Sequence, residues 1–308
     1  MSLRSLKLPT IDFINKRKYA MVFSALLLIV SIISLGLQGL KLGIDFTGGT
    51  LIEVGYQQTA DLEDIRTKLA SANYTGTNVQ YFGSDTEVLI QLEPQAISSA
   101  KLSSSIIQML GDGIDVRRVE FVGPKVGEEL TNDGGLALLY ALIGILIYVA
   151  FRFEYRFALG SITALIHDVI ITLGVFSILQ IAFDLTVLAA ILAVIGYSLN
   201  DTIVVFDRIR ENFLSTRHIE PVPIVNDALN QTLARTLMTS LTTLLVLLAL
   251  FYLGGEVIHS FAGALIIGVV IGTYSSIFVA SSMILALGIS KEDMLPSEKE
   301  KKEIDARP

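Results

Sequence analysis

Six long apolar segments dominate this sequence and restrict what it can fold into. They cover residues 19–37, 134–151, 157–181, 185–206, 236–253 and 261–287. Each reaches the roughly 17 to 25 apolar residues that a helix needs to cross a bilayer. Only 17% of the residues are charged, compared with about a quarter in a soluble domain. We therefore predict a polytopic α-helical membrane protein with six transmembrane helices.

Lys and Arg residues predict how these helices are oriented. They gather in residues 1–18, in the loop between the second and third segments, in residues 207–235 and in the tail 288–308. Basic flanks of this kind stay on the cytoplasmic side. We therefore expect a multi-pass membrane protein with both termini in the cytoplasm and residues 38–133 on the opposite side of the membrane. No cleavage site of small residues follows the first apolar segment, so we expect that segment to be retained.

The polar residues between the first two apolar segments predict a separate domain. Alternation predicts strands, and helical spacing predicts helices, in the order 50–56 (strand), 61–70 (helix), 78–82 and 87–92 (strands), 95–110 (helix) and 114–122 (strand). This order is that of the split βαβ, ferredoxin-like pattern. We therefore expect a small α+β domain on the non-cytoplasmic side. It contains no His and no Cys, so we expect a contact surface rather than a catalytic site.

The sequence GIDFTGGT at residues 43–50, hereafter the glycine junction, leaves two alternatives open. The first is a hinge in which Asp45, Gly48 and Gly49 cap and turn the chain from a helix into a strand. The second is a phosphate-binding loop. A P-loop requires a Lys followed by Ser or Thr after its glycines, and none follows here. We favour the hinge.

Asn200 and Asp201 lie near the cytoplasmic end of the segment 185–206. An ionisable group at membrane depth costs free energy unless water, a partner or protonation relieves it, and such groups mark functional sites. One alternative is a hydrogen bond between the two side chains that serves packing. The other is that Asp201 takes up and releases a proton.

Arg235 immediately precedes the segment 236–253 and is the candidate partner of Asp201. One cytoplasmic loop joins the two helices, so both residues lie near the same membrane face. The Arg235 side chain either extends to the lipid headgroups or turns inward to pair with Asp201, in which case protonation of the acid would release the arginine. Thr239, Thr242 and Thr243 follow on one helix face, where they line a water path or bond across helices.

Asp168 lies near the midplane of the segment 157–181, next to His167. It is either a packing hydrogen-bond partner of a neighbouring helix or a functional ionisable group. Adjacent residues do not face each other on a helix, so we expect Asp168 and His167 to point in different directions.

Small residues recur every three or four positions in two of the apolar segments. The two series are Ala189, Ala193, Gly196 and Asn200, and Ala264, Gly268, Gly272 and Ser276. Faces of small residues let helices approach closely. We therefore expect both faces, and with them Asn200, to lie in the interior.

Four sequence motifs together resemble the SecF branch of the bacterial SecD/SecF family. They are GIDFTGGT (43–50), GYSLNDTIVVFDRIRE (196–211), RTLMTSLTT (235–243) and GTYSSIF (272–278). The resemblance covers almost the whole chain in the same order. It implies a membrane subunit of the Sec protein-export machinery, related to the resistance–nodulation–division transporters. By motif matching, Asp201 and Arg235 fall at the proton-relay positions of this family, and the family implies the bacterial inner membrane with residues 38–133 in the periplasm. We interpret Asn200, Asp168 and Thr239 as supporting polar residues in the membrane, although the resemblance assigns no role to Asp168.

The resemblance also implies partners. A SecF-like subunit pairs with SecD and uses the proton-motive force to promote preprotein translocation across the inner membrane, after SecYEG and the ATPase SecA. We further expect YajC and YidC as partners and lipids around the helices. Two alternatives remain: half of a proton-coupled small-molecule exporter, and a purely structural stabiliser of the translocon.

Several classes of function are not expected. The net charge of −7 argues against a nucleic-acid partner. The absence of cysteine excludes disulfides and thiolate metal sites. No nucleotide-binding loop, catalytic triad or metal cluster is evident, so we predict no enzymatic activity and no cofactor.

Overall fold

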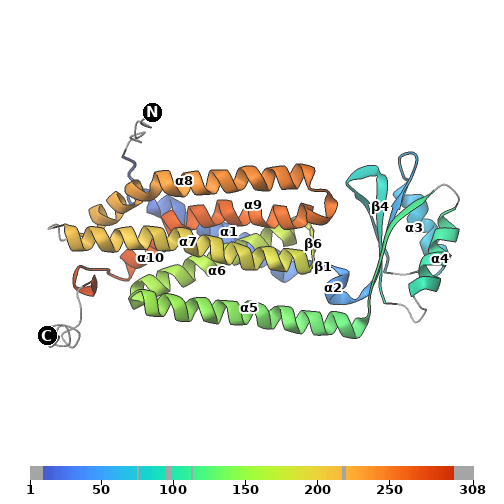
Figure 1. Cartoon of the computed structure of the whole chain (residues 1–308), viewed down its shortest axis with the longest axis horizontal. Helices are drawn as coiled ribbons and strands as arrows, with labels where there is room; N and C mark the ends of the chain where they lie inside the picture. Colours follow the sequence, from blue (N-terminus) through green and yellow to red (C-terminus); the bar gives the residue numbers. More distant parts are fainter. Residues whose placement is uncertain (1–9, 75, 95–98, 112–113, 217–219, 295–308) are drawn as a thin grey trace, which may run out of the picture.

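The structure is a computed structural model that describes residues 10–74, 76–94, 99–111, 114–216 and 220–294. Figure 1 shows a bundle of long helices with an α+β domain at one end. The described segments nearest the two termini lie at the opposite end of the bundle (Figure 1).

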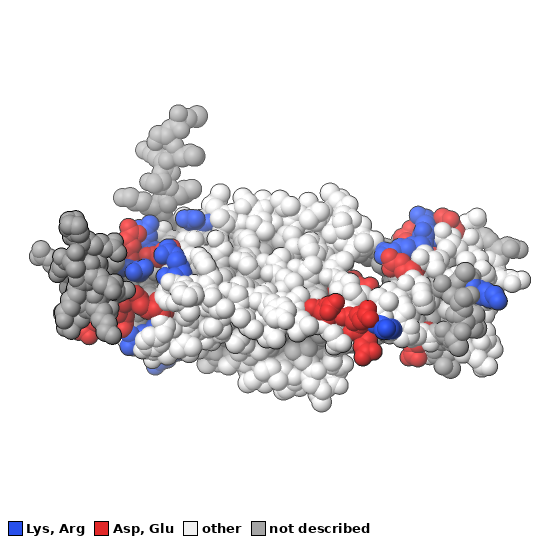
Figure 2. Space-filling view, turned by 60° about the horizontal axis from the view of Figure 1, so that its bottom comes forward, with Lys and Arg blue, Asp and Glu red and all other residues white. Residues whose placement is uncertain are grey.

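Six helical spans of the described chain are long and apolar enough to cross a membrane, as predicted. They are α1 (Arg17–Leu37), α5 (Pro124–Arg152), α6 (Tyr155–Leu179), α7 (Leu185–Ser215), α8 (Pro221–Leu253) and a composite last span (Val257–Ala286). In the view of Figure 2, charged side chains gather toward the two ends of the molecule and leave a broad uncharged band between them. This distribution fits a bundle surrounded by lipid.

The helices extend beyond the apolar segments that predicted them. α5 begins at Pro124 rather than near residue 134, because Gly123 and Pro124 start the helix instead of breaking it. A proline in the first turn costs no hydrogen bond. The expected cytoplasmic loop 207–235 is almost entirely helical, since α7 continues to Ser215 and α8 is one unbroken helix from Pro221.

The last span contains an irregularity that the sequence did not predict. α9 (Glu256–Ser275) passes into a π-helical segment, η1 (Ser276–Ala280), before α10 (Ser281–Ala286) completes the span. A π segment adds a residue to the turn and often occurs at functional sites. Hydropathy gives no sign of it, because the segment is as apolar as the helix around it.

The α+β domain has the predicted order of elements. It comprises β2 (Gly49–Gly55), α3 (Leu62–Ser71), β3 (Asn78–Phe82), β4 (Ser84–Leu92), α4 (Ser99–Leu110) and β5 (Asp115–Val122). The four strands form an antiparallel sheet in the order β3-β4-β2-β5, which is that of the split βαβ pattern. Both helices cover one face of the sheet (Figure 1), over a core that includes Ile52, Ile90 and Ile106.

The boundaries of this domain differ only slightly from those predicted. β4 begins at Ser84 because Gly83, with φ of 78°, makes the turn almost alone. The first four residues of the expected helix 95–110 lie outside the described residues, and α4 begins at Ser99.

The two faces of small residues have opposite surroundings. The face on α9 is buried as predicted, and an added Cβ at Gly268 would lie only 2.0 Å from Val194 Cγ2 of α7. The face on α7 was wrongly placed in the interior. Its members Ala189, Ala193, Gly196 and Asn200 are all exposed. α7 instead packs on α9 through Val194 and Ser198, so its small-residue face is left uncovered by this chain.

An N-terminal strap, residues 10–16, fastens α8 at the end of the bundle farthest from the sheet. Asn226 Oδ1 accepts a hydrogen bond from the backbone N–H of Phe13 at 2.9 Å, and Asn230 Oδ1 accepts one from Ile11 at 2.7 Å. Both amides also donate to the Ile11 carbonyl. Phe13 is buried and packs edge-on against Phe278 of η1. The strap therefore joins α8 to the π segment.

Candidate functional site

Asp201 is a buried carboxylate in the membrane-spanning part of α7, with 3% of its surface exposed. Its Oδ2 has no hydrogen-bond partner among the described residues, and the same is true of the hydroxyls of Thr202 and Thr236. The alternative of a hydrogen bond between Asn200 and Asp201 is therefore not realised on this oxygen, and Asn200 is exposed on α7. Asp201 thus keeps an uncommitted oxygen at membrane depth.

Arg235 lies in α8, and its positive charge acts on Asp201. Arg235 is exposed, and the described residues show no ion pair between the two side chains within 4.0 Å. The structure therefore brings Arg235 into the electrostatic range of Asp201 without a direct salt bridge. Of the two alternatives from the sequence, the closed ion pair is therefore not formed among the described residues.

Two threonines of the stripe that follows Arg235 donate hydrogen bonds within their own helix. Thr239 Oγ1 donates to the carbonyls of Arg235 (3.1 Å) and Thr236 (2.9 Å) in its own helix, and Thr242 bonds back in the same way. Thr239 is exposed, as are Arg235 and Asn200. Asn200 on α7 and Arg235 and Thr239 on α8 thus face outward, and this chain encloses Asp201 only in part.

Asp168 lies in α6 and is 1% exposed. Its Oδ2 accepts hydrogen bonds from Ser198 of α7 at 2.5 Å and from Ser275 of α9 at 2.7 Å. His167 Nδ1 lies 2.9 Å from its Oδ1 and donates to it. The expectation that His167 and Asp168 point apart was wrong: successive positions on a helix differ by about 100°, but an imidazole ring is long enough to reach back.

These contacts extend to a fourth helix through Tyr274 of α9. The Tyr274 ring stacks on the His167 ring. Its hydroxyl donates to the Ala20 carbonyl of α1 at 2.7 Å and lies 3.0 Å from Ser24 Oγ. A polar path therefore crosses the bundle from α1 to α7, with Asp168 accepting hydrogen bonds at its centre.

The glycine junction attaches the α+β domain to α7. Residues Ile44–Thr47 form a single turn, α2, and the Asp45 Oδ2 accepts a hydrogen bond from the backbone N–H of Leu185 at 3.0 Å. Asp184 caps the same helix end through the N–H of Val187. Asp45 therefore caps α7, the helix that carries Asp201, and not the junction itself. β1 (Lys41–Leu42) and β6 (Ala182–Phe183) pair in parallel beside it.

Gly48 and Gly49 make the junction compact. Their φ values are 69° and 132°, which side chains rarely adopt. A Cβ at Gly49 would lie 2.3 Å from the Leu92 carbonyl oxygen, and one at Gly48 would lie 3.0 Å from Pro124 Cα. The predicted turn from helix to strand is present, but as a closely packed connection between β2, β4 and α5.

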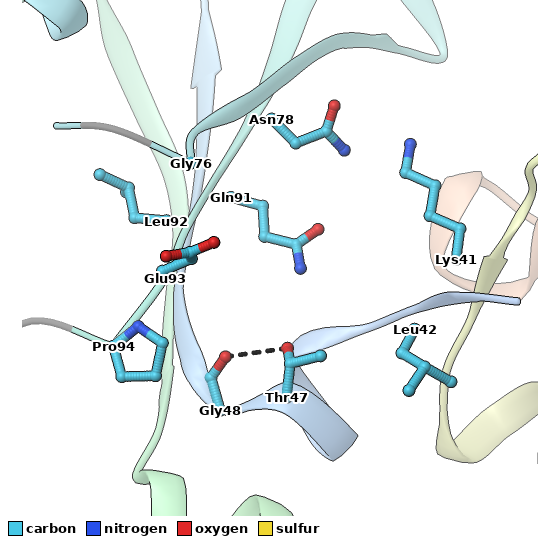
Figure 3. A pocket seen from close by; sticks show the side chains of 10 residues that line it. All are labelled: Lys41, Leu42, Thr47, Gly48, Gly76, Asn78, Gln91, Leu92, Glu93 and Pro94. Carbon is cyan, nitrogen blue, oxygen red and sulfur yellow. Dashed lines mark hydrogen bonds between the residues drawn. The ribbon is translucent and has the colours of Figure 1, made fainter. Parts of the chain in front are cut away.

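A cavity of about 410 Å³ opens between this junction and the sheet. Figure 3 shows Lys41 and Thr47 on its junction side, with Asn78, Gln91 and Glu93 on the sheet side. Lys41 Nζ donates to Gln80 Oε1 at 2.8 Å, and burial lowers the pKa of this ammonium group. Lys41 therefore bridges the junction and the sheet at the mouth of the helical bundle.

Among the described residues, no group of three or more His, Asp or Glu side chains could hold a metal ion. The candidate site is therefore built from intramembrane carboxylates, hydroxyls and one arginine.

Comparisons with known proteins agree with this architecture. The family model of the C-terminal region of the protein export membrane proteins SecD/SecF matches residues 103–290, and the model of the SecD/SecF GG motif matches residues 33–60. The protein translocase subunit SecF of Vibrio alginolyticus is 54% identical, over 97% of this chain and 97% of its own length. The SecF subunit of Pseudomonas aeruginosa is 46% identical, over 99% and 100%.

Solved structures agree as well. The crystal structure of SecDF from Thermus thermophilus, a translocon-associated membrane protein, superimposes with a TM-score of 0.85 at 38% identity and covers 92% of this chain. SecDF in a super-membrane-facing form gives 0.68 at 36% identity. The chain spans only 39% and 41% of those two SecDF chains, but nearly the full length of its SecF relatives. The chain therefore belongs to the SecD/SecF family of protein export membrane proteins, as a SecF-type translocase subunit.

Proposed function

We propose that this subunit works with a SecD-type subunit to couple the proton-motive force to preprotein translocation across the inner membrane. The proton is taken up and released at Asp201, and Arg235 responds to the charge of that carboxylate. Neither step needs covalent chemistry on the substrate, so the proposed function is transport without enzymatic activity.

The continuity of α7 supports this proposal most strongly. One helix carries Asp201 in its membrane span and has its first turn capped by Asp45 of the glycine junction. The junction leads within four residues into β2 of the sheet. A movement of α7 on protonation of Asp201 would therefore be transmitted to the α+β domain, because the connection between them is short.

The outward face of α7 supports a second membrane half as partner. Ala189, Ala193, Gly196 and Asn200 are exposed there, although small-residue faces in membranes ordinarily pack against another helix. The matched SecDF chains are more than twice as long as this chain. A SecD-type subunit on this face would cover Asn200 and complete the surroundings of Asp201.

The energy available per proton limits the mechanism. One charge that crosses the membrane yields about 2.3 kcal/mol per 100 mV. This free energy shifts an equilibrium between two orientations of the α+β domain about fiftyfold. Unfolding a substrate in one step would need more, so we expect repeated cycles.

The proposed setting follows from the basic flanks and from the family. Both termini face the cytoplasm of the inner membrane and the α+β domain lies in the periplasm, where it would contact the emerging preprotein. SecYEG and SecA would supply that preprotein, with YajC and YidC as further neighbours.

The experiment is an export assay in membrane vesicles that contain the complete translocase, with and without a proton gradient. Asp201→Asn and Arg235→Ala are expected to assemble normally and to abolish the stimulation of export by the gradient. Asp227→Asn, which removes an exposed carboxylate from α8, serves as the control. Normal stimulation in both site variants would contradict the proposal.

A further inference from the structure

The proton exchange proposed for Asp201 does not involve Asp168, so the role of Asp168 needs another explanation. It is more deeply buried than Asp201 and already accepts three hydrogen bonds, from His167, Ser198 and Ser275. These contacts join three helices, α6, α7 and α9.

Two of these contacts lie at the packing of α7 against α9 and at the end of α9. Ser198 packs against Gly272, where an added Cβ would be 3.0 Å from Ser198 Cβ. Ser275 is the last residue of α9 before the π segment η1. The Asp168 carboxylate thus fixes α7 to α9 immediately before the backbone of the last span changes its hydrogen-bond pattern.

Ser198 and Asp201 are three residues apart on α7. Residues at this spacing are neighbours on one helix face, and both are buried. The place of Asp201 therefore depends on how Ser198 is held.

We propose that Asp168 is a positioning residue for proton exchange at Asp201, because it holds α7 against α9 through Ser198 and Ser275. The inference rests on the proposed function of Asp201. Loss of either serine contact lets α7 move relative to α9 and thereby changes the surroundings of Asp201. Among the described residues, neither serine is hydrogen-bonded to the Asp201 carboxylate itself.

Several titratable or charged groups lie near these contacts. His167 of α6 lies within hydrogen-bond distance of Asp168, Tyr274 of α9 stacks on His167, and Asp201 lies one turn from Ser198 on α7. The charge of Arg235 of α8 acts on Asp201. On α1 and α5, Arg17 is the first residue, Arg152 is the last, and Asp133 lies inside α5. A test must therefore report on Asp201 separately from these groups.

The test uses a hydrophobic carbodiimide, which reacts with protonated carboxyl groups in membranes, on the purified complex. Labelling of Asp201 is located by mass spectrometry and followed as a function of pH. In Ser198→Ala and in Ser275→Ala we expect the midpoint for Asp201 to move by at least about 0.5 pH unit, a threefold change in proton affinity. Ser161→Ala removes an equally buried hydroxyl of α6 that has no partner among the described residues, and it should leave the midpoint unchanged.

Midpoints of both serine variants that coincide with that of Ser161→Ala would overturn the inference. Labelling does not require transport, so the result stands apart from the export assay. If the gradient had no effect on export but the serine variants shifted the midpoint, the positioning role would stand and the proposed function would fail.

Discussion

Asp168 and Asp201 are two carboxylates of one membrane bundle with opposite surroundings. Asp168 is buried and accepts hydrogen bonds from groups on two neighbouring helices and from His167. Asp201 is almost as deeply buried, yet its Oδ2 has no partner among the described residues, and Arg235 acts on it only from a distance. Sequence and burial alone would rank the two alike.

The difference indicates how a membrane protein divides structural and functional work. A carboxylate with all its acceptor sites filled stabilises one arrangement of helices, because any other arrangement leaves its donors unpaired in an apolar medium. A carboxylate with an open acceptor site can exchange a proton without breaking a network. The residues beside Asp201 that face outward, Asn200 and Arg235, leave room for a partner subunit to regulate that exchange.

The largest expected effect is a difference in folding stability between a substitution of Asp168 and one of Asp201. Asp168→Leu removes the acceptor of Ser198 and His167 and leaves Ser275 only the Gly272 carbonyl at 3.1 Å, and each unpaired buried donor costs about 1–3 kcal/mol. We expect little folded protein from this variant. Asp201→Leu should unfold within a few degrees of the wild type, as measured by thermal unfolding in detergent. Equal destabilisation by the two substitutions would contradict the distinction between them.

The next effect compares the two small-residue faces. Gly268→Leu places a side chain where even a Cβ would overlap Val194, so we expect the chain to fail to assemble its helices. Gly196 is exposed and no atom lies within 4 Å of an added Cβ, so Gly196→Leu should fold. It is expected to lower co-purification with a SecD-type subunit at least tenfold. Undiminished co-purification would mean that the outward face of α7 is not the contact surface.

The smallest effect concerns the far end of the helix that carries Asp201. Asp45→Ala and Asp184→Ala each remove one cap of α7, at a cost of about 1 kcal/mol. Only Asp45 belongs to the glycine junction, so Asp45→Ala should reduce the gradient-dependent part of export several-fold more than Asp184→Ala. Similar export from both variants would show that capping alone, rather than the link to the α+β domain, accounts for Asp45.

The sequence predicted most of the fold, because spans and strands follow from local hydropathy. The six helices, the α+β order of the domain and the buried position of Asp201 all have a local signal. Helical periodicity also predicted that Gly196 and Asn200 share a face. It could not predict that this face is uncovered, since periodicity identifies which residues lie together but not what packs on them.

Contacts between residues far apart in the sequence could not be predicted either, because periodicity does not show which elements pack together. Nothing near Asp168 in the sequence indicates Ser198 or Ser275, and nothing near Asp45 indicates that it caps α7. The π segment was also missed, because an extra residue in one turn changes backbone hydrogen bonds but not composition. Of these features, the contacts with Ser198 and Ser275 distinguish the surroundings of Asp168 from those of Asp201.

We expect protonation of Asp201 to move the α+β domain through α7. The chain contains no cysteine, so spin labels can be attached to single cysteines introduced at the exposed positions Val119 on β5 and Tyr252 on α8. Their separation is then measured by pulsed electron paramagnetic resonance in lipid nanodiscs. We expect the distance distribution to change between alkaline and acidic pH, and Asp201→Asn, which cannot titrate, to show one distribution at both. A pH response that persists unchanged in Asp201→Asn, or a labelled protein with Asp201 intact that gives no response, would show that Asp201 does not move the domain.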